Sequence, residues 1–543
     1  MSNAAYAAPP TRAARGVATQ PRRCRTSRRT LVALLPAGIA LATLTWLRAP
    51  EPPGLDQSLF AFYGDSLARG LHLYRDLWDS KPPGIFALYA AAVRVAGVAH
   101  AALGLDIMAA AASALLAACL LRARGNLAMA MGALLTASLP SAPVFGGPML
   151  AGQAEPLMTP LCLGAMLCMQ RRDGAWAAGF LIGAAACLKL VALALLPAIL
   201  AAAPAAMGWR PRTIARVVAG MLAPIGACAL GLALAGTLDE AIAAVVQYPR
   251  AYAAEIASRT AFLPLVTRGA TRLGRGMPLV LLLAAIGLTG ARRAGSLARS
   301  LLVWIAGACA AILAQRQMAG YHLFLLVPPL ALAAGLGAHE IAAMARRLPA
   351  TRRILAVSLG AVLAVLVLVP ELRLWVRHYR PHVRLHAGTI DSNGFLQELG
   401  GPGPAWLEAG ALVEPLHRRA RDGDRIFVWG LAPAVYARSG CLPFARWAFH
   451  QTLLVEGSPL SRRWPSATSR REALLRDWEV GPPRFVVIVR GDRSGLEPQE
   501  SQAELLGFES LARLLAADYT PFNATKSYTL LERRTPSGHD AAR

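Results

Sequence analysis

A series of long apolar segments constrains this chain more than any other feature of its sequence. Each segment approaches the roughly 17 to 25 residues that a helix needs to cross a bilayer. The segments lie at residues 31–47, 101–121, 126–145, 154–170, 212–236, 276–291, 298–314, 320–343 and 351–371. The sequence therefore predicts a multi-spanning α-helical membrane protein.

The composition agrees with a membrane protein and argues against a soluble enzyme. Of the 543 residues, 55% are hydrophobic and 16% are charged, whereas soluble domains carry about 25% charged residues. The net charge of +25 comes almost entirely from arginine, because the only lysines are Lys81, Lys189 and Lys526. Many of the arginines lie in short loops between apolar segments, as a membrane imposes, so nucleic acid is not expected as a partner.

The apolar run 176–207 decides the topology. As one helix it would put the basic residues at 209–212 outside the cell. As two short helices meeting near Lys189, it leaves all the short basic loops in the cytoplasm, which the positive-inside tendency favours. We therefore expect a break near Lys189 and about eleven spans, with thirteen as the upper limit. The N-terminus is then cytoplasmic and the C-terminus extracytoplasmic in an inner (plasma) membrane.

The two ends of the chain differ from the apolar part. Residues 1–30 contain seven arginines and no acidic residue, which predicts a disordered basic cytoplasmic arm. Residues 31–371 form the predicted transmembrane domain, with a first outer loop at about 49–98. Residues 372–543 combine one helical stretch, 406–421, with three strand-like runs, which predicts an extracytoplasmic α/β domain. The strand-like runs are 426–429, 485–489 and 528–532.

The cysteines do not indicate a covalent framework. None of the eight forms a C-x-x-C pair, and six lie inside apolar runs, where cysteine packs as a small hydrophobe. Neither a disulfide framework nor a zinc site is indicated.

The first outer loop collects residue types that carry chemistry. It contains Asp56, and then Tyr74-Arg-Asp-Leu-Trp-Asp79-Ser-Lys81-Pro-Pro-Gly84. A solvated loop whose charges satisfy one another is one interpretation. The other is a site with an acid for proton transfer and a cation for an anionic group, with Lys81 held at headgroup height by the prolines.

Further polar residues occur at outer ends of predicted spans. Glu155 begins one span, where helix capping alone would also explain a carboxylate. Lys189 lies inside an apolar run, where a charge is costly and marks a candidate functional site. Arg316, Tyr321 and His322 precede Pro328-Pro329, and a snorkelling anchor is the alternative there. Together these acids and cations suit a lipid-linked phosphate or diphosphate whose tail lies in the bilayer.

These motifs resemble the GT-C fold membrane glycosyltransferases, and most of all the branch with the protein mannosyltransferases and the aminoarabinose transferases. The resemblance rests on Asp56, the loop from Tyr74 to Gly84, Glu155, Lys189 in a broken run, and the Tyr321-His322 pair. The tail segments Asp424-Arg-Ile-Phe-Val-Trp429-Gly430 and Pro483-Arg-Phe485 are similar to the periplasmic domain of bacterial members. The resemblance covers roughly residues 31–535.

The resemblance implies a role for each matching residue. Asp56 would be the general base that takes a proton from the acceptor. Lys81, Lys189 and Arg316 would bind the donor phosphate, Asp79 would orient Lys81, and Glu155, Tyr321 and His322 would support the substrate or a metal. Many members have a glutamate directly after the aspartate, and Gln57 stands there in this chain. The sequence leaves divalent metal dependence open.

The implied activity is transfer of a hexose or pentose from a polyprenyl-phosphate donor to a glycan, lipid or protein acceptor. One base and an in-line attack favour inversion, whereas retention would need a second carboxylate such as Asp65 or Asp76. A polytopic transporter or lipid flippase using the same charges is the alternative class, and a catalytically silent anchor for the tail is a third. Transport sites lie near the bilayer midplane, so the depth of the polar cluster separates the first two.

Overall fold

The structure is a computed structural model that describes eleven ranges of the chain. These are residues 28–145, 151–204, 209–259, 261–290, 296–315, 318–400, 402–421, 423–448, 451–455, 467–493 and 499–534. Two sequence predictions fall outside them. Most of the basic arm, residues 1–27, and the proposed phosphate ligand Arg316 are not described.

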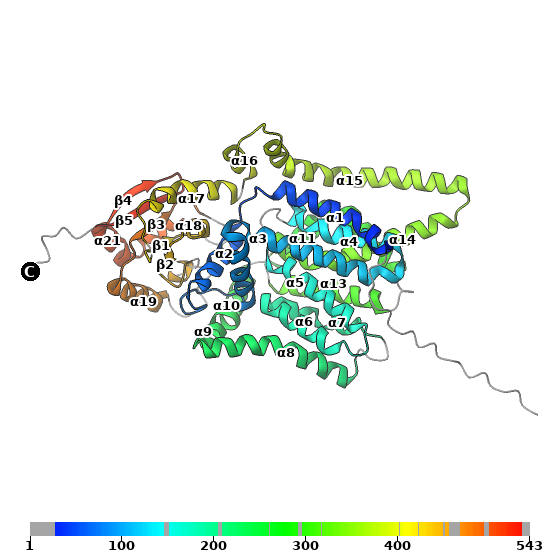
Figure 1. The fold of residues 1–543 in the computed structure, drawn as a ribbon, viewed down its shortest axis with the longest axis horizontal. Helices are drawn as coiled ribbons and strands as arrows, with labels where there is room; N and C mark the ends of the chain where they lie inside the picture. The colour runs from blue at the N-terminus through cyan, green and yellow to red at the C-terminus, as the bar shows by residue number, and fades with distance from the viewer. Residues whose placement is uncertain are drawn as a thin grey trace, which may run out of the picture.

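A helix lies at each segment where the sequence predicts a span, and together these helices form one bundle (Figure 1). The bundle helices are α1 (Arg28–Arg48), α3 (Pro83–Leu121), α4 (Asn126–Ser138), α5 (Ala154–Met169), α6 (Ala175–Leu188), α7 (Leu196–Ala201), α8 (Pro211–Leu234), α12 (Pro278–Gly290), α13 (Ser296–Ala314), α14 (Val327–Arg347) and α15 (Ala350–His386). Shorter elements join them at the end nearer the sheet or within broken helices. These are α2 (Leu55–Ala68), η2 (Leu139–Ser141), η3 (Pro143–Phe145), η5 (Leu190–Leu195), α9 (Leu238–Ile242), η6 (Ala243–Gln247), α10 (Tyr248–Arg259), α11 (Phe262–Gly276) and η8 (Gly320–Leu326); η1 (Arg122–Arg124) follows α3 at its other end.

Fewer helices than predicted are long enough to cross a bilayer unbroken. Within the described ranges, six helices have the length and apolar composition of a span, or seven if the bent pair α11 and α12 counts as one. The chain forms shorter apolar helices at 154–169, where we expected a full span, and at 175–188 and 190–201, where we expected two short helices. The expected number of eleven counts these shorter pieces as separate crossings.

The predicted break near Lys189 is confirmed. Helix α6 ends at Leu188, and Lys189 has an extended backbone with φ −158° and ψ 125°. The chain then continues as the 3₁₀ segment η5 before α7. The break puts the side chain of Lys189 at a helix end instead of in the middle of an apolar helix.

Helix α3 begins directly after the first outer loop, at Pro83, and continues into the span expected at 101–121. It is interrupted once, at Gly97. Gly97 has φ +73°, a conformation that glycine adopts at little cost and residues with a Cβ adopt rarely. The interruption changes the direction of the helix between the outer loop and the bundle.

Close contact between α6 and α8 depends on small residues. A Cβ at Gly179 would lie 2.0 Å from the carbonyl oxygen of Val217, so only glycine fits there. Small residues allow such approaches between membrane helices. Further along the same pair, the sulfur atoms of Cys187 and Cys228 lie 3.6 Å apart, a proximity that the spacing of the cysteines in the sequence did not indicate.

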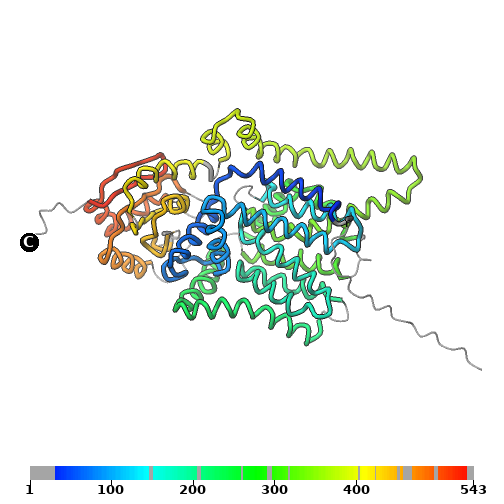
Figure 2. Tube along the Cα trace, viewed as in Figure 1, coloured from blue at the N-terminus to red at the C-terminus, as the bar shows by residue number. Residues whose placement is uncertain are grey.

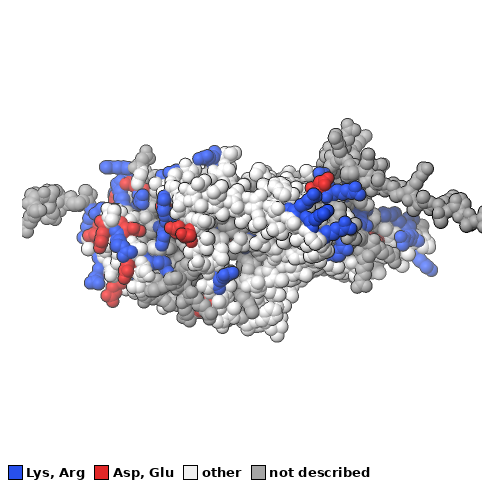
Figure 3. All heavy atoms as spheres, turned by 90° about the horizontal axis from the view of Figure 1, so that it is seen from below, with Lys and Arg blue, Asp and Glu red and all other residues white. Residues whose placement is uncertain are grey.

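Helix α15 runs along the outside of the bundle toward the C-terminal part of the chain (Figure 2). Its apolar side chains are exposed, for example Leu355 at 69% and Leu366 at 63%, as expected for a face that contacts lipid. The predicted domain boundary at 371/372 falls inside this helix. On the face shown in Figure 3, the charged side chains gather toward the two ends of the molecule, and a broad band between them is uncharged.

The C-terminal part contains a five-stranded mixed sheet with the order β2-β1-β3-β5-β4. The strands are β1 (Arg425–Trp429), β2 (Leu442–Pro443), β3 (Phe485–Val489), β4 (Tyr519–Ala524) and β5 (Tyr528–Arg533). β1 is parallel to β2 and β3, whereas β5 is antiparallel to β3 and β4. The helical elements are α16 (Ser392–Leu399), α17 (Pro402–His417), α18 (Pro433–Ser439), η9 (Gln451–Leu454), α19 (Ala467–Val480), α20 (Ser501–Leu506) and α21 (Glu509–Asp518).

The sheet region packs on the first outer loop of the bundle. The rings of Phe62 in α2 and Tyr436 in α18 stack at 4.8 Å between centroids. The backbone N–H of Trp78 donates a hydrogen bond of 2.8 Å to the carbonyl of Arg446. These contacts hold the loop between α2 and α3 from one side, while the bundle holds it from the other.

Candidate functional site

Asp56 lies in the first turn of α2, next to an extended Gly54 that precedes the helix. A carboxylate is favoured there by the positive end of the helix dipole. The rest of α2 is almost entirely buried, so the helix cannot shift without disturbing the core. The buried face of α2 therefore fixes the position of Asp56.

Lys81 lies at the end of the loop that leads into α3. Its Nζ atom is 4.0 Å from Oδ1 of Asp56 and 3.8 Å from Oδ1 of Asp79. It also lies over the ring of Phe60, 4.9 Å from the centroid. The backbone N–H of Lys81 donates a hydrogen bond of 2.8 Å to Asp79, whose side chain is fully buried. Asp79 thus contacts both the backbone and the ammonium group of Lys81.

Two tyrosines hold the loop that carries Lys81. The hydroxyl of Tyr74 donates a hydrogen bond of 2.9 Å to the carbonyl of Lys81, and that of Tyr63 donates one of 2.9 Å to the carbonyl of Trp78. Tyr74 has φ +68°, which costs about 1 to 3 kcal/mol for a residue other than glycine. A strained residue with a buried ring indicates that the loop is held in one conformation.

Glu155 and Lys189 form a second acid and cation pair. Glu155 is in the first turn of α5, and its Oε1 atom lies 2.5 Å from Nζ of Lys189. The other oxygen, Oε2, is buried and has no hydrogen-bond partner among the described residues. Lys189 also lies over the ring of Tyr321 in η8, 5.2 Å from the centroid. The break in the apolar run therefore directs Lys189 to Glu155.

Gln153, which is not among the site residues predicted from the sequence, connects the two pairs. Its Nε2 atom donates a hydrogen bond of 2.9 Å to Oδ2 of Asp56. The preceding residue, Gly152, has φ +69°, and a Cβ there would lie 2.3 Å from the hydroxyl of Tyr89. That hydroxyl donates a hydrogen bond of 2.9 Å to the carbonyl of Gly152. A glycine before a polar residue at a helix start is the only sequence signal for this turn.

A second glycine brings the loop of Lys81 against α6. A Cβ at Gly84 would lie 2.6 Å from the carbonyl oxygen of Cys187, two residues before Lys189. Because nothing larger than hydrogen fits, the start of α3 and the end of α6 are in direct contact. The close approach explains how Lys81 and Lys189, more than a hundred residues apart, belong to one cluster.

The charges of the cluster act on one another. Burial by itself lowers the pKa of Lys81, but the negative charges of Asp56, Asp79 and Glu155 outweigh it and raise the pKa above its ordinary value of 10.5. Tyr321 lies within electrostatic reach of both Asp56 and Glu155. Five charged side chains therefore share one site, which carries a net charge of −1 when all are ionised. They are Asp56, Asp79, Lys81, Glu155 and Lys189.

Other candidate residues lie beside this cluster or apart from it. His322 is buried and contacts the ring of Tyr321 edge-on at 4.5 Å between centroids. Asp65 is 3.6 Å from Arg69, and Asp76 is 3.1 Å from Arg75, so both pair with neighbours along the chain. Within the described residues, no group of three or more His, Cys, Asp or Glu side chains could hold a metal ion.

A buried ionic cluster lies behind the turn at Gly152. Arg48 contacts Glu51 at 3.1 Å and Asp106 at 3.0 Å, and Nε2 of His382 in α15 is 2.7 Å from Glu51. The backbone N–H of Gly152 lies near Asp106 and favours its ionised form. Burial by itself would raise the pKa of Glu51, but Arg48 and His382 outweigh it and lower that pKa below its ordinary value. The cluster connects α1, α3 and α15 to the turn that carries Gln153.

Most of the chain is similar in structure to a solved protein, ArnT. ArnT from Cupriavidus metallidurans bound to undecaprenyl phosphate matches with a TM-score of 0.56 at 14% identity, over 93% of this chain and 99% of that one. Its apo state matches with a TM-score of 0.55 at 14% identity, over 93% and 98%. The chain thus has the GT-C fold. The predicted resemblance to the GT-C fold is thereby confirmed.

More distant similarity extends to an oligosaccharyltransferase. The enzyme from Archaeoglobus fulgidus, tethered to an acceptor peptide, matches with a TM-score of 0.49 at 12% identity, over 84% of this chain and 69% of that one. No protein-family model and no curated protein matches the sequence. The similarity to known proteins that these comparisons find is therefore a similarity of structure.

Proposed function

We propose that this GT-C chain is a glycosyltransferase that moves a hexose or pentose from a polyprenyl-phosphate donor to an acceptor on the extracytoplasmic side of the inner membrane. One observation carries the proposal. A carboxylate and an ammonium group, Asp56 and Lys81, lie 4.0 Å apart beside a second such pair, Glu155 and Lys189. The similar fold of ArnT in complex with undecaprenyl phosphate supports a polyprenyl-phosphate donor.

Asp56 acts as the general base in this proposal. It accepts the proton of the acceptor hydroxyl or amine while the acceptor oxygen or nitrogen attacks the anomeric carbon of the sugar. The hydrogen bond from Gln153 occupies Oδ2 and orients the carboxylate. Oδ1, the atom nearest Lys81, then faces the donor side and is the oxygen that takes the proton.

Lys81 and Lys189 bind the donor phosphate, with Arg316 as a third cation. Fixed positive charges stabilise the negative charge that develops on the departing lipid phosphate, a contribution often worth about 3 to 4 kcal/mol in transfer reactions. A sugar has to fit between the base and the phosphate ligands, and a gap of 4.0 Å is too small for it. Lys81 therefore swings away from Asp56 when the donor binds, which its long flexible side chain permits.

Two supporting roles follow from the contacts. Asp79 holds the Lys81 backbone, and Glu155 holds Lys189 until the donor phosphate takes its place. The unpartnered Oε2 of Glu155 is available to a sugar hydroxyl or a divalent metal. Tyr321 and His322 close the same side of the site.

Inversion of the anomeric centre is the expected stereochemistry. A retaining mechanism needs a second nucleophilic carboxylate close to the sugar. Asp65 and Asp76, the two candidates from the sequence, pair with Arg69 and Arg75 along the chain. Asp79 and Glu155, the other carboxylates of the cluster, pair with Lys81 and Lys189. Asp56 is then the base, and an in-line attack gives inversion.

The place of the cluster in the fold supports a transferase over a transporter or lipid flippase. All the charged residues of the cluster lie in a loop, at a helix start or at a helix end, at the end of the bundle that carries the outer loop. Transport sites lie near the bilayer midplane. The N-terminus is cytoplasmic and the sheet region extracytoplasmic in this proposal, with a glycan, lipid or protein as the acceptor.

Reconstitution tests the proposal. Purified protein in liposomes is supplied with a polyprenyl-phosphate sugar and an envelope extract as the source of acceptor, and free polyprenyl phosphate and sugar-bearing product are measured by mass spectrometry. We expect both to appear together, with inverted anomeric configuration in the product. Movement of intact donor across the bilayer without sugar transfer would instead support the flippase alternative.

A further inference from the structure

Two cysteines from different helices bring their thiols together beside the candidate site. The sulfur atoms of Cys187 in α6 and Cys228 in α8 lie 3.6 Å apart, and both side chains are half-buried free thiols. Cys187 is the last residue but one of α6, and Cys228 lies within the last two turns of α8. A disulfide bond is about 2.05 Å long, so the two sulfurs form one after approaching by roughly 1.5 Å. The mechanism proposed above uses neither thiol.

The packing of α6 on α8 keeps the two thiols next to each other. A Cβ at Gly179 would lie 2.0 Å from the carbonyl oxygen of Val217, and one at Gly183 would lie 2.2 Å from that of Met221. The two backbones are therefore in contact along the turns of α6 that lead to Cys187. Reactive groups held in place react with each other much faster than with groups on other molecules. The fold thus favours a bond between these two cysteines over cross-links to other chains.

The pair is in contact with the elements that carry both lysines of the charged cluster. Lys189 follows Cys187 by two residues, and a Cβ at Gly84 would lie 2.6 Å from the carbonyl oxygen of Cys187. The hydroxyl of Tyr74, which donates a hydrogen bond to the carbonyl of Lys81, is within electrostatic reach of both cysteines. A shift of the end of α6 toward α8 therefore displaces Lys189 and disturbs the loop of Lys81.

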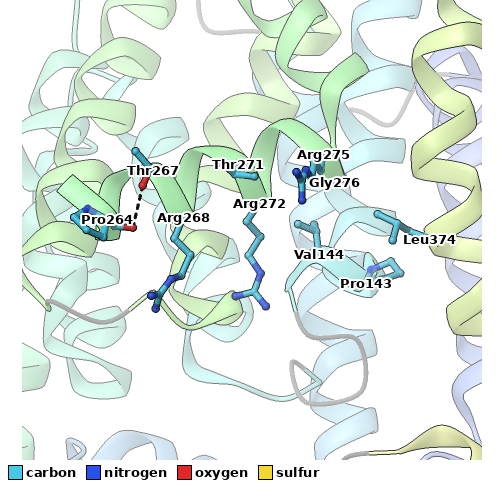
Figure 4. A pocket seen from close by; sticks show the side chains of 10 residues that line it. All are labelled: Pro143, Val144, Pro264, Thr267, Arg268, Thr271, Arg272, Arg275, Gly276 and Leu374. Carbon is cyan, nitrogen blue, oxygen red and sulfur yellow. Dashed lines mark hydrogen bonds between the residues drawn. The ribbon is translucent and has the colours of Figure 1, made fainter. Parts of the chain in front are cut away.

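This connection does not pass through the cavity beside α11. That cavity has a volume of about 710 Å³ and lies between η3, α11 and α15 (Figure 4). Among the described residues that line it are Pro143, Arg272 and Leu374, and none belongs to α6 or α8. A bond between the two cysteines leaves the wall of this cavity unchanged and acts on the lysines through α6.

We propose that Cys187 and Cys228 form a reversible redox site, whose closure to a disulfide weakens donor binding at the charged cluster. Closure draws the end of α6 toward α8, and a misplacement of about 1 Å in a positioned group can cost up to about 100-fold. The effect on the donor rests on the proposed function, whereas formation of the bond does not. The extracytoplasmic position of the pair, which belongs to the same proposal, is in an oxidising compartment.

The oxidant is a disulfide compound, and the reaction is thiol–disulfide exchange. One cysteine thiolate attacks the disulfide of the oxidant, which forms a mixed disulfide and releases one thiol. The second cysteine thiolate then attacks the cysteine sulfur of the mixed disulfide and releases the second thiol. The two cysteines lose two protons and two electrons in total, and the oxidant is reduced to two thiols. A dithiol reductant reverses both steps.

Peptide mapping of the full-length protein in liposomes tests the site. The protein is treated with 4,4′-dithiodipyridine, a disulfide that enters membranes, and then with or without dithiothreitol. We expect mass spectrometry to find a linked peptide pair that contains Cys187 and Cys228 and that disappears on reduction. Cys309→Ser is the matched control, because it removes an exposed thiol of α13 and should leave this link intact.

Donor use is measured on the same samples. The donor KM of the oxidised wild type should be at least about tenfold higher than that of the reduced protein. Cys187→Ser and Cys228→Ser cannot form the link, so their donor KM should stay the same under the same treatment. An equal rise in either serine variant would mean that the oxidant acts elsewhere, and would overturn the proposed effect on the donor.

A second readout does not require sugar transfer. The chain has three lysines, and Lys526 lies between β4 and β5, outside the charged cluster. The rate at which acetic anhydride acylates each lysine is measured by mass spectrometry before and after oxidation. Formation of the link should raise the rate at Lys189 severalfold, because the shift of α6 disturbs its contact with Glu155, and should leave the rate at Lys526 unchanged.

The outcomes separate this proposal from the proposed function. Absence of a linked peptide pair with Cys187 and Cys228 in the treated wild type would overturn the redox site. A link that changes neither the donor KM nor the acylation of Lys189 would overturn its effect on the charged cluster. If the reduced protein transfers no sugar but the link forms and changes the acylation of Lys189, the transferase proposal fails and the redox site stands.

Discussion

Nε2 of Gln153 lies 2.9 Å from Oδ2 of Asp56, although 97 residues separate them in the chain. The hydrogen bond joins the start of α2 to the turn before α5. It leaves Asp56 with one oxygen fixed and the other directed to Lys81. Most of the predictions below concern this arrangement.

Replacing Gln153 by alanine should slow sugar transfer while leaving the protein folded. A hydrogen bond to a charged group contributes about 1.5 to 3 kcal/mol, so we expect kcat to fall by roughly 10 to 100-fold. Turnover in liposomes and the thermal unfolding temperature are the measurements. Gln315→Ala is the control, because that amide donates a hydrogen bond to the carbonyl of Ala311 in the adjacent helix α13. Equal losses in both variants would contradict an orienting role.

Lys81→Ala should raise the donor KM, because the ammonium group is proposed to bind the donor phosphate. It should have little effect on the unfolding temperature. Lys81→Arg should recover part of the donor binding, since guanidinium also binds phosphate but with a different geometry. Lys526→Ala, in the hairpin between β4 and β5, removes the same charge from an exposed position far along the chain and should have no effect. An unchanged donor KM in Lys81→Ala would argue against the assignment.

Donor binding should not depend on the titration of Lys81 between about pH 6 and pH 9. The pKa of Lys81 is raised above 10.5, so the ammonium stays protonated as the pH increases through this range. Its contribution is fully present below pH 10.5 and is lost only as the pH rises through the raised value. Donor KM measured across this range in Lys81→Arg and the wild type should run in parallel. A loss of donor binding near pH 8 in the wild type alone would show that this pKa is lowered.

Lys189→Met should destabilise the protein, because it leaves the fully buried carboxylate of Glu155 without its cation. Breaking a buried pair from one side costs about 3 to 5 kcal/mol, whereas replacing both partners is close to neutral. The double variant Lys189→Met/Glu155→Met should therefore unfold at a higher temperature than the single variant, while remaining inactive. If the single and double variants unfold at the same temperature, the unpaired carboxylate of Glu155 does not destabilise the fold, which would contradict this prediction.

Glu51→Gln should change the acid side of the stability profile. The pKa of Glu51 is lowered from 4.5, so its ionised form stabilises the fold above the unfolded pKa. That contribution is lost as the pH falls through the lower folded value. As the pH is lowered from about 7 to about 3, the unfolding temperature of the variant should fall less steeply than that of the wild type. Near pH 7 the variant should unfold at a lower temperature than the wild type. Parallel curves for variant and wild type would exclude Glu51 as a source of the acid sensitivity.

The sequence predicted the apolar helices of the bundle and the break at Lys189 because apolar runs and isolated charges are local signals. It also located three strands, β1, β3 and β5, since their apolar residues are contiguous. It missed β4, which contains Pro521 and is mostly exposed, and the two-residue β2. Such edge strands have little apolar pattern in their sequence, because pairing with the neighbouring strand determines where they form.

Contacts between residues that are far apart in the chain could not be predicted from local sequence patterns. The part played by Gln153 depends on the φ of Gly152 and on the position of Tyr89. The ring of Phe60 beneath Lys81 and the proximity of Cys187 to Cys228 likewise follow from how helices pack.

The rate of sugar transfer by Asp56→Asn tests the account most directly. The variant and the wild type are reconstituted at equal amounts in liposomes with a polyprenyl-phosphate sugar and acceptor, and the release of polyprenyl phosphate is followed. Asparagine keeps the shape of aspartate but cannot accept the proton, so we predict that transfer falls by about 100-fold or more with unchanged donor binding. Transfer at the wild-type rate by a folded Asp56→Asn variant would contradict the assignment of Asp56 as the general base.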